Sequence, residues 1–122
     1  MPKYAALIYG PEETGTPEQL ERVTEEYNAF TEAARAAGVV AGGEALYDTN
    51  TATTVHLPNG KGGEPIFTDG PFAETKEVLG GFYLLDVADL DEALKWAQQI
   101  PGAWYGRVEV RPVVEWEDQP EG

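Results

Sequence analysis

The sequence contains no cysteine, which excludes disulfide bonds and thiolate metal sites. Its only histidine is His56, and a zinc ion normally needs about three protein ligands, so we expect no metal site. Basic residues are also scarce, with 8 Lys and Arg against 22 Asp and Glu and a formal net charge of -14. Such a surface repels phosphate backbones and anionic lipid head groups, so we expect neither nucleic acid nor a membrane as a partner.

Long apolar runs are absent as well, since none approaches the roughly 20 residues that a bilayer-spanning helix needs. The first residues, 1–9, are too short for the apolar region of a signal peptide. The sequence also lacks the Walker, GxGxxG, GxSxG and HExxH patterns that mark nucleotide, hydrolase and zinc-protease sites. We therefore expect a soluble, cytoplasmic protein that uses no cofactor.

The composition is that of a globular protein, with 42% hydrophobic and 25% charged residues in a chain of 122. This length suits one domain of ordinary size with a real core. We interpret residues 1–122 as a single domain whose core covers about 3–115, followed by an acidic tail at 116–122.

A helix is predicted from Pro17 to about residue 37. Thr16 and Gln19 have the spacing of a capping box, and Pro17 suits the first helical position. Leu20, Val23, Tyr27, Phe30 and Ala34 then recur at steps of three and four, as on one helical face. The other expected elements, in chain order, are a strand at 4–9, a strand at 43–47, a hairpin within 51–69, a strand at 81–87, a helix at 90–97 and a strand at 108–114.

This order, β-α-β, a hairpin and then β-α-β, predicts an α+β fold. Two helices against one mainly antiparallel sheet make a ferredoxin-like layer. Helices on a single face leave the other face of the sheet bare, and the strands are rich in apolar residues. A second copy would cover that face at least cost, so we predict a homodimer joined sheet to sheet.

The segment 69–81, DGPFAETKEVLGG, is the richest in chemistry. It holds three acids, a lysine, a proline and three glycines in 13 residues between two apolar runs. A plain turn needs only about two to five residues of the Gly, Pro, Asn or Asp type. The excess of ionisable groups predicts a functional site here.

Four stretches resemble the YCII-related, DGPF-motif family over roughly residues 3–115: residues 4–10, 43–46, 69–81 and 106–113. The resemblance implies a dimeric α+β barrel, in which two ferredoxin-like units pack their sheets together. Some members are encoded near alternative sigma factors, which implies an accessory role in a stress or sigma-factor pathway.

One branch of that family carries a histidine and an aspartate proposed to act as an acid/base pair. Asp69 matches the aspartate of the branch. The histidine position on the first helix is occupied here by Glu25, Glu26 and Tyr27, so the chain departs from the His–Asp pattern.

Five residues are the candidates for a site. Asp69, at the end of a strand, could act as a general base if it is desolvated, or could instead bond the backbone of its own turn. Lys76 could hold an anionic group or be solvated. Phe72 covers either the core, the dimer interface or a ligand. Glu44 could share a cleft with Asp69 or be exposed. Glu77 is adjacent to Lys76 and cannot face it; we predict Glu77, like Lys76, Phe72 and Glu44, as a ligand-binding residue.

Three functions remain open from the sequence. The first is a dimeric small-molecule-binding domain with its pocket between sheet and helices near residues 69–77. The second is a cofactor-free enzyme of the lyase, isomerase or dehydrochlorinase type that uses Asp69 as acid/base. The third is a structural or partner-binding dimer. We expect His56 to lie on an exposed face and Arg111 to pair with an acid on a neighbouring strand.

Overall fold

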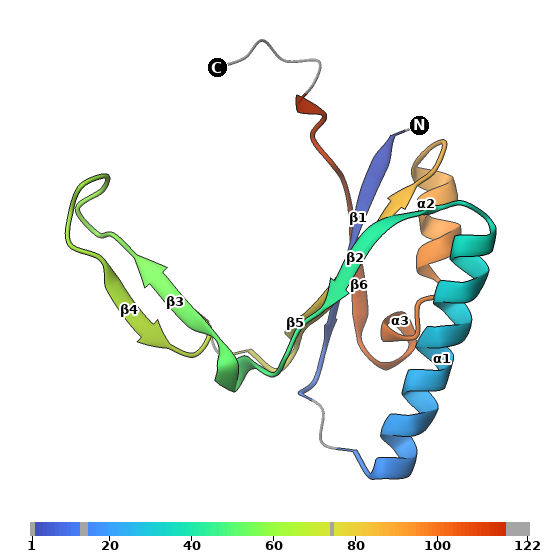
Figure 1. The fold of residues 1–122 in the computed structure, drawn as a ribbon, viewed down its shortest axis with the longest axis horizontal. Coiled ribbons are helices and arrows are strands. Elements are labelled where there is room, and N and C mark those ends of the chain that lie inside the picture. The colour runs from blue at the N-terminus through green and yellow to red at the C-terminus, as the bar shows by residue number, and fades with distance from the viewer. Residues whose placement is uncertain (1, 13–14, 74, 117–122) are drawn as a thin grey trace.

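A computed structural model describes residues 2–12, 15–73 and 75–116 (Figure 1). Its elements, in chain order, are β1 (Lys3–Gly10), α1 (Pro17–Ala36), β2 (Val40–Ala45), a 3-10 turn (Thr49–Thr51), β3 (Thr53–His56), β4 (Ile66–Asp69), β5 (Val78–Asp86), α2 (Leu90–Ala97), α3 (Gly102–Tyr105) and β6 (Arg107–Pro112).

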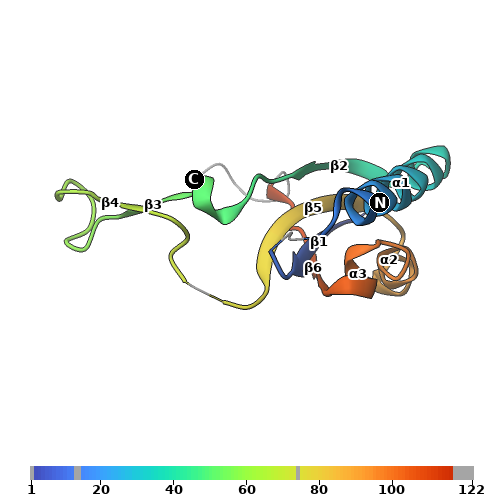
Figure 2. The ribbon, with the colours of Figure 1, turned by 90° about the horizontal axis from the view of Figure 1, so that it is seen from below.

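Four of the strands form one antiparallel sheet in the order β2-β5-β1-β6. The helix α1 connects β1 to β2 and α2 connects β5 to β6, so each connection passes over one strand. All three helices lie on the same side of the sheet (Figures 1 and 2). This arrangement confirms the ferredoxin-like α+β fold that the order of elements predicts.

Both ends of α1 are fixed by the bonds that its sequence predicts. The hydroxyl of Thr16 accepts from the Gln19 amide at 3.2 Å, and the Gln19 side chain accepts from the Thr16 amide at 2.9 Å. At the other end Gly38 adopts a φ of 73°, a region that glycine enters without penalty. The amides of Gly38 and Val39 then reach back to the carbonyls of Arg35 and Ala34, both at 3.0 Å, which is a Schellman motif.

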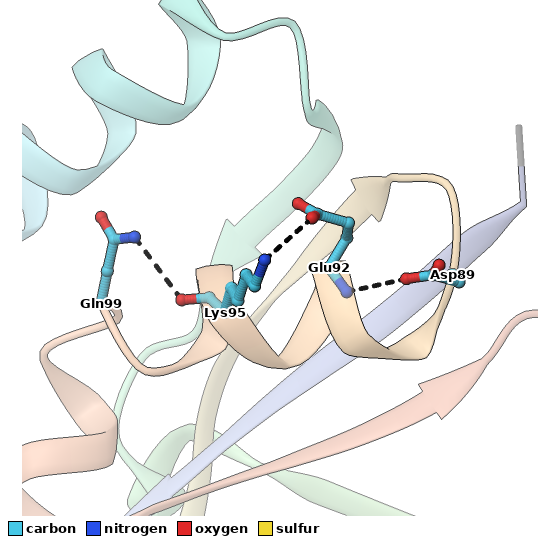
Figure 3. A network of polar contacts seen from close by, with 4 residues as sticks. All are labelled: Asp89, Glu92, Lys95 and Gln99. Atoms are coloured by element: carbon cyan, nitrogen blue, oxygen red, sulfur yellow. Dashed lines mark hydrogen bonds and ion pairs between the residues drawn. The ribbon is translucent and has the colours of Figure 1, made fainter.

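The helix α2 begins at its cap, Asp89, whose carboxylate accepts from the Glu92 amide at 2.9 Å (Figure 3). Lys95 pairs with Glu92 at 3.3 Å, and the Gln99 side chain donates to the Lys95 carbonyl at 3.5 Å. All of these bonds lie at the surface. The network therefore orders the helix but contributes little to the stability of the fold.

The core lies between the sheet and the two long helices. Phe30 of α1 is central to it, because its ring packs edge-on to Tyr83 at 5.0 Å and to Trp96 at 6.3 Å between ring centroids. Leu85 and Ile100 are completely buried beneath it. The remaining buried apolar residues are Tyr4, Ala6, Ala34, Val87, Ala93 and Ala97.

Several details differ from the sequence-based prediction. β5 begins at Val78, so residues 78–81 of the 69–81 segment belong to a strand. β2 begins at Val40, three residues before the predicted start at residue 43. The short helix α3 was not expected, because Pro101-Gly102 reads only as a stop signal. Arg111 pairs with Glu109 of its own strand at 3.2 Å, so the prediction of a cross-strand partner was wrong. The edge position of Pro112 in β6 is confirmed.

The predicted hairpin exists as β3 and β4, which pair only with each other. It projects from the sheet on the side away from the helices, as both views show (Figures 1 and 2). We call residues 53–69 the arm. Nearly all of its side chains are exposed, including His56 as expected.

No helix in the described part of the chain is both long and apolar enough to cross a membrane.

Candidate functional site

A groove of about 870 Å³ lies on the helix side of the sheet, between α1, β2, β5 and α3. Sites for small organic molecules commonly have volumes of about 300–1,000 Å³. The groove therefore has the size of a small-molecule site.

Glycine is frequent among the residues that line the groove. Half of the 14 glycines of the chain line it: Gly10, Gly15, Gly43, Gly80, Gly81, Gly102 and Gly106. Close packing limits the alternatives at several of them, since a Cβ at Gly43 would come within 2.5 Å of the Phe82 carbonyl. The backbone itself therefore forms much of the groove surface.

One stripe of α1 supplies the wall that faces these glycines. Arg22, Tyr27, Thr31 and Arg35 all line the groove, at spacings of four or five residues that keep them near one helical face. Thr31 is anchored across the groove by a hydrogen bond of 2.9 Å between its hydroxyl and that of Tyr83 on β5. Arg22, Thr31 and Arg35 are polar, whereas Tyr27 also packs against the core and belongs to the apolar face of the helix.

Tyrosine is the commonest aromatic residue in the groove. Five of the six tyrosines of the chain line it: Tyr9, Tyr27, Tyr47, Tyr83 and Tyr105. A tyrosine offers an apolar ring and a polar hydroxyl, which suits a site that binds both a ring and its polar substituents.

The hydroxyl of Tyr105 donates to a carboxylate oxygen of Glu26 at 2.8 Å. This hydrogen bond, assisted by desolvation and by the negative charge of Glu26, raises the pKa of Tyr105 above its usual value of 10.0, and Arg22 opposes the shift. The Tyr105 phenol is neutral at neutral pH with or without this shift, and its lone pairs can accept from a ligand.

The ionisable groups in the groove are of both signs. Arg22 and Arg35 lie on α1, while Glu12 and Asp48 come from the loops. A groove with both charges and five phenols can hydrogen-bond a ligand at several points. Because charges of both signs are present, Coulomb attraction alone does not favour an anionic ligand over a cationic one.

One predicted site residue, Glu44, borders this groove, but it pairs with Phe82 in the register, so its side chain lies on the opposite face of the sheet. Asp69, Phe72, Lys76 and Glu77 do not line the groove, and neither does any other described residue of 69–77. The groove lies between sheet and helices but not at residues 69–77, so a pocket near that segment stays a prediction. The groove uses the strand that follows this segment, from Val78 onward, rather than the segment itself.

Asp69 is the last residue of β4, at the base of the arm, and is exposed. Its neighbours hold the turn: the Gly70 amide donates to the Ala52 carbonyl at 2.7 Å, and the Thr54 hydroxyl donates to the Gly70 carbonyl at 2.8 Å. Gly70 has a φ of 96°, which explains the glycine of the motif. The Asp69 carboxylate makes no hydrogen bond with any described residue, so the alternative in which it ties its own turn is not seen.

The other predicted residues lie at the surface between the arm and β5. Phe72 is 90% exposed, so it covers nothing within its own chain. Lys76 is exposed, and Glu77 pairs with Arg107 at 3.5 Å. Glu74 lies outside the described residues. The roles of Asp69, Phe72, Lys76 and Glu77 in a site stay predictions, as does that of Glu44.

No group of three or more His, Asp or Glu side chains capable of holding a metal occurs within residues 2–12, 15–73 and 75–116. The sequence-based reasoning did not identify the tyrosines or the two arginines. A partial signal was present, since Thr31 and Arg35 are four residues apart on the helix and lie outside the apolar face assigned to it.

Comparison with known proteins adds the family. The sequence profile of the YCII-related domain matches residues 2–117. The chain is also 41% identical, over 115 residues, to the uncharacterised protein R00369 of Rhizobium meliloti strain 1021, and the similarity covers 90% of each chain.

Proposed function

The chain belongs to the YCII-related family, and from that premise we propose that it binds a small organic molecule in the groove beside α1. The observation that carries the proposal is the groove of about 870 Å³ with its glycine floor and tyrosine lining. The ligand class that suits it best is a compact aromatic or hydroxylated compound, because phenols and arginines can bond polar substituents around a ring.

A binding role fits the groove better than catalysis does. The predicted base, Asp69, lies outside the groove of its own chain, at the base of the arm. The enzymatic alternative would need a second copy to carry its Asp69 to this groove. An accessory role in a stress or sigma-factor pathway stays part of the proposal, on the strength of the family resemblance alone.

The test is a thermal-shift screen with a panel of small phenols, aromatic carboxylates and ketones. A compound present at about 100 times its Kd stabilises the folded state by about 2.7 kcal/mol, which raises Tm by several degrees. The blocking variant is Thr31→Phe, which places a ring in the middle of the groove. The matched control is Glu32→Phe, because Glu32 is the exposed neighbour on α1 that does not line the groove.

We expect a hit to shift wild type and Glu32→Phe equally and to leave Thr31→Phe unshifted. An equal shift of all three proteins would place the ligand elsewhere and contradict the proposal. A panel without any hit would favour the structural or partner-binding alternative.

We also propose the homodimer joined through the bare face of the sheet. Cross-strand pairs Ala5–Leu84 and Leu7–Phe82 lie on the face opposite to that of the core pairs Tyr4–Leu85 and Ala6–Tyr83. None of the described helices α1, α2 and α3 covers this face (Figure 2). Sedimentation equilibrium at micromolar concentration should give twice the chain mass of 13.3 kDa; a monomer mass would contradict the dimer.

A further inference from the structure

Among the described residues, no other strand pairs with the two strands of the arm. Its two strands have four residues each and pair only with each other. An isolated two-stranded hairpin is at best marginally stable in water. The arm nevertheless exposes large apolar side chains: Val55 at 55%, Ile66 at 50% and Phe67 at 67%. Such a hairpin needs a surface to pack against.

The register divides the arm into two faces. Val55 lies opposite Phe67, and cross-strand neighbours share a face; the pair Thr53 and Asp69 lies on the same face at the base of the arm. Leu57 follows the last residue of β3, two residues beyond Val55. We call Val55, Leu57 and Phe67 the apolar face of the arm. The pairs His56–Ile66 and Thr54–Thr68 belong to the opposite face, on which Ile66 is the one large apolar side chain of the paired residues.

The direction of the arm indicates what it packs against. It leaves the sheet on the side without helices, where the bare apolar face lies (Figures 1 and 2). A second sheet stacked on that face would lie about 10 Å away, whereas a four-residue strand is roughly 13 Å long. The arm is therefore long enough to pass beside a second copy seated on the bare face.

We propose that the arm of each copy packs its apolar face against the body of a second copy. This inference depends on the proposed dimer and adds to it the element that completes the interface. In a two-fold dimer each arm contacts the other copy, so both hairpins are covered at once.

The area of the apolar face supports a second copy as the occupant. Taking about 200 Å² for an aromatic side chain, Phe67 would bury roughly 130 Å². Val55 and Leu57 bring the total to the order of 250 Å². A stable interface buries about 800 Å² per partner, so the arm needs a partner that also covers the bare sheet face, which a second copy does.

The first experiment uses the absence of cysteine. Phe67→Cys introduces a single thiol, which is labelled with benzophenone maleimide and irradiated in a mixture of 14N and 15N chains. We expect cross-links between 14N and 15N chains, located by mass spectrometry on the body of the second chain. The matched control, Ile66→Cys, carries the same label on the opposite face of the arm and should cross-link at several-fold lower yield.

The second experiment measures the dimer itself. The double variant Val55→Ser/Phe67→Ser should weaken dimerisation at least tenfold in sedimentation equilibrium, while Ile66→Ser should change it less than threefold. Because all three side chains are exposed, the fold of each chain should persist, as checked by circular dichroism.

The outcomes separate the two proposals. A wild-type monomer at every concentration overturns both the dimer and the arm contact. A dimer that persists in Val55→Ser/Phe67→Ser, without cross-links between isotopes, leaves the sheet-to-sheet dimer in place and overturns the arm contact. Cross-links confined to one chain show that the arm folds onto its own body and also overturn it.

Discussion

Replacing Gly102 by alanine tests the contact that closes one end of the groove. Gly102 is buried at the start of α3, where that helix approaches β1. A Cβ built there would lie 2.4 Å from Cγ2 of Ile8 and 2.8 Å from the hydroxyl oxygen of Tyr27. The Tyr27 hydroxyl is the end of a long side chain and can move, but the Ile8 methyl is close to the backbone of a central strand and cannot move easily.

We expect the overpacking to cost about 1–3 kcal/mol of unfolding free energy. For a domain of this size, 1 kcal/mol corresponds to a change in Tm of about 4 °C, so Gly102→Ala should melt roughly 4–12 °C below wild type. Guanidinium unfolding followed by circular dichroism measures the same loss, with an unchanged m-value if only stability is affected.

Gly10→Ala is the matched control, because Gly10 also lines the groove but a Cβ there meets nothing within 4 Å. Its stability should stay within about 0.5 kcal/mol of wild type. If Gly102→Ala were as stable as Gly10→Ala, α3 would not approach β1 as closely as described, and the argument for this end of the groove would fail.

Three further predictions concern the N-cap residue Thr16, the phenol of Tyr105 and the carboxylate of Asp69. Thr16→Ala removes the N-cap of α1 and should lower the unfolding free energy by about 1 kcal/mol in chemical denaturation, whereas no loss would show that the cap contributes nothing. Glu26→Gln should lower the pKa of Tyr105 toward 10.0, measured in a titration of tyrosine absorbance; an unchanged titration would contradict the hydrogen bond. The stability that this pair contributes is present below pH 10 and is lost as pH rises through the raised pKa of Tyr105. Asp69→Asn should leave Tm within about 1 °C, because the carboxylate bonds no described residue; a drop of several degrees would show that it ties the turn.

The order of elements could be predicted because each signal was local. The capping box of Thr16 and Gln19 and the glycine at position 38 depend on neighbours along the chain, and the structure confirms both. The helix α3 could not be predicted in this way. Its four residues are fixed by the approach of Gly102 to β1, a contact between segments far apart in sequence.

The groove could not be predicted from the sequence for a related physical reason. The residues at 69–77 lie at a turn and at the base of the arm, held by Gly70 and Thr54, and do not line the groove, so their role in a site stays a prediction. The groove is bounded by residues of α1, β1, β2, β5 and α3, which are far apart in the sequence and form no motif. Only once the strands are paired does the space between them and α1 become visible.

The segment that leads from β2 to the arm forms a wall of the groove. Tyr47, Asp48 and Thr49 of this segment line the groove, and the Thr49 hydroxyl bonds the carboxylate of Glu12 on the opposite side. Because this segment is joined to the arm through the 3-10 turn, a contact that fixes the arm also restrains this wall. In the proposed dimer, ligand occupancy and subunit association are linked equilibria, so a ligand that tightens association must itself bind the associated form more tightly by the same factor. With such a ligand, a higher concentration of the protein would raise the fraction of dimer and with it the apparent affinity for the ligand.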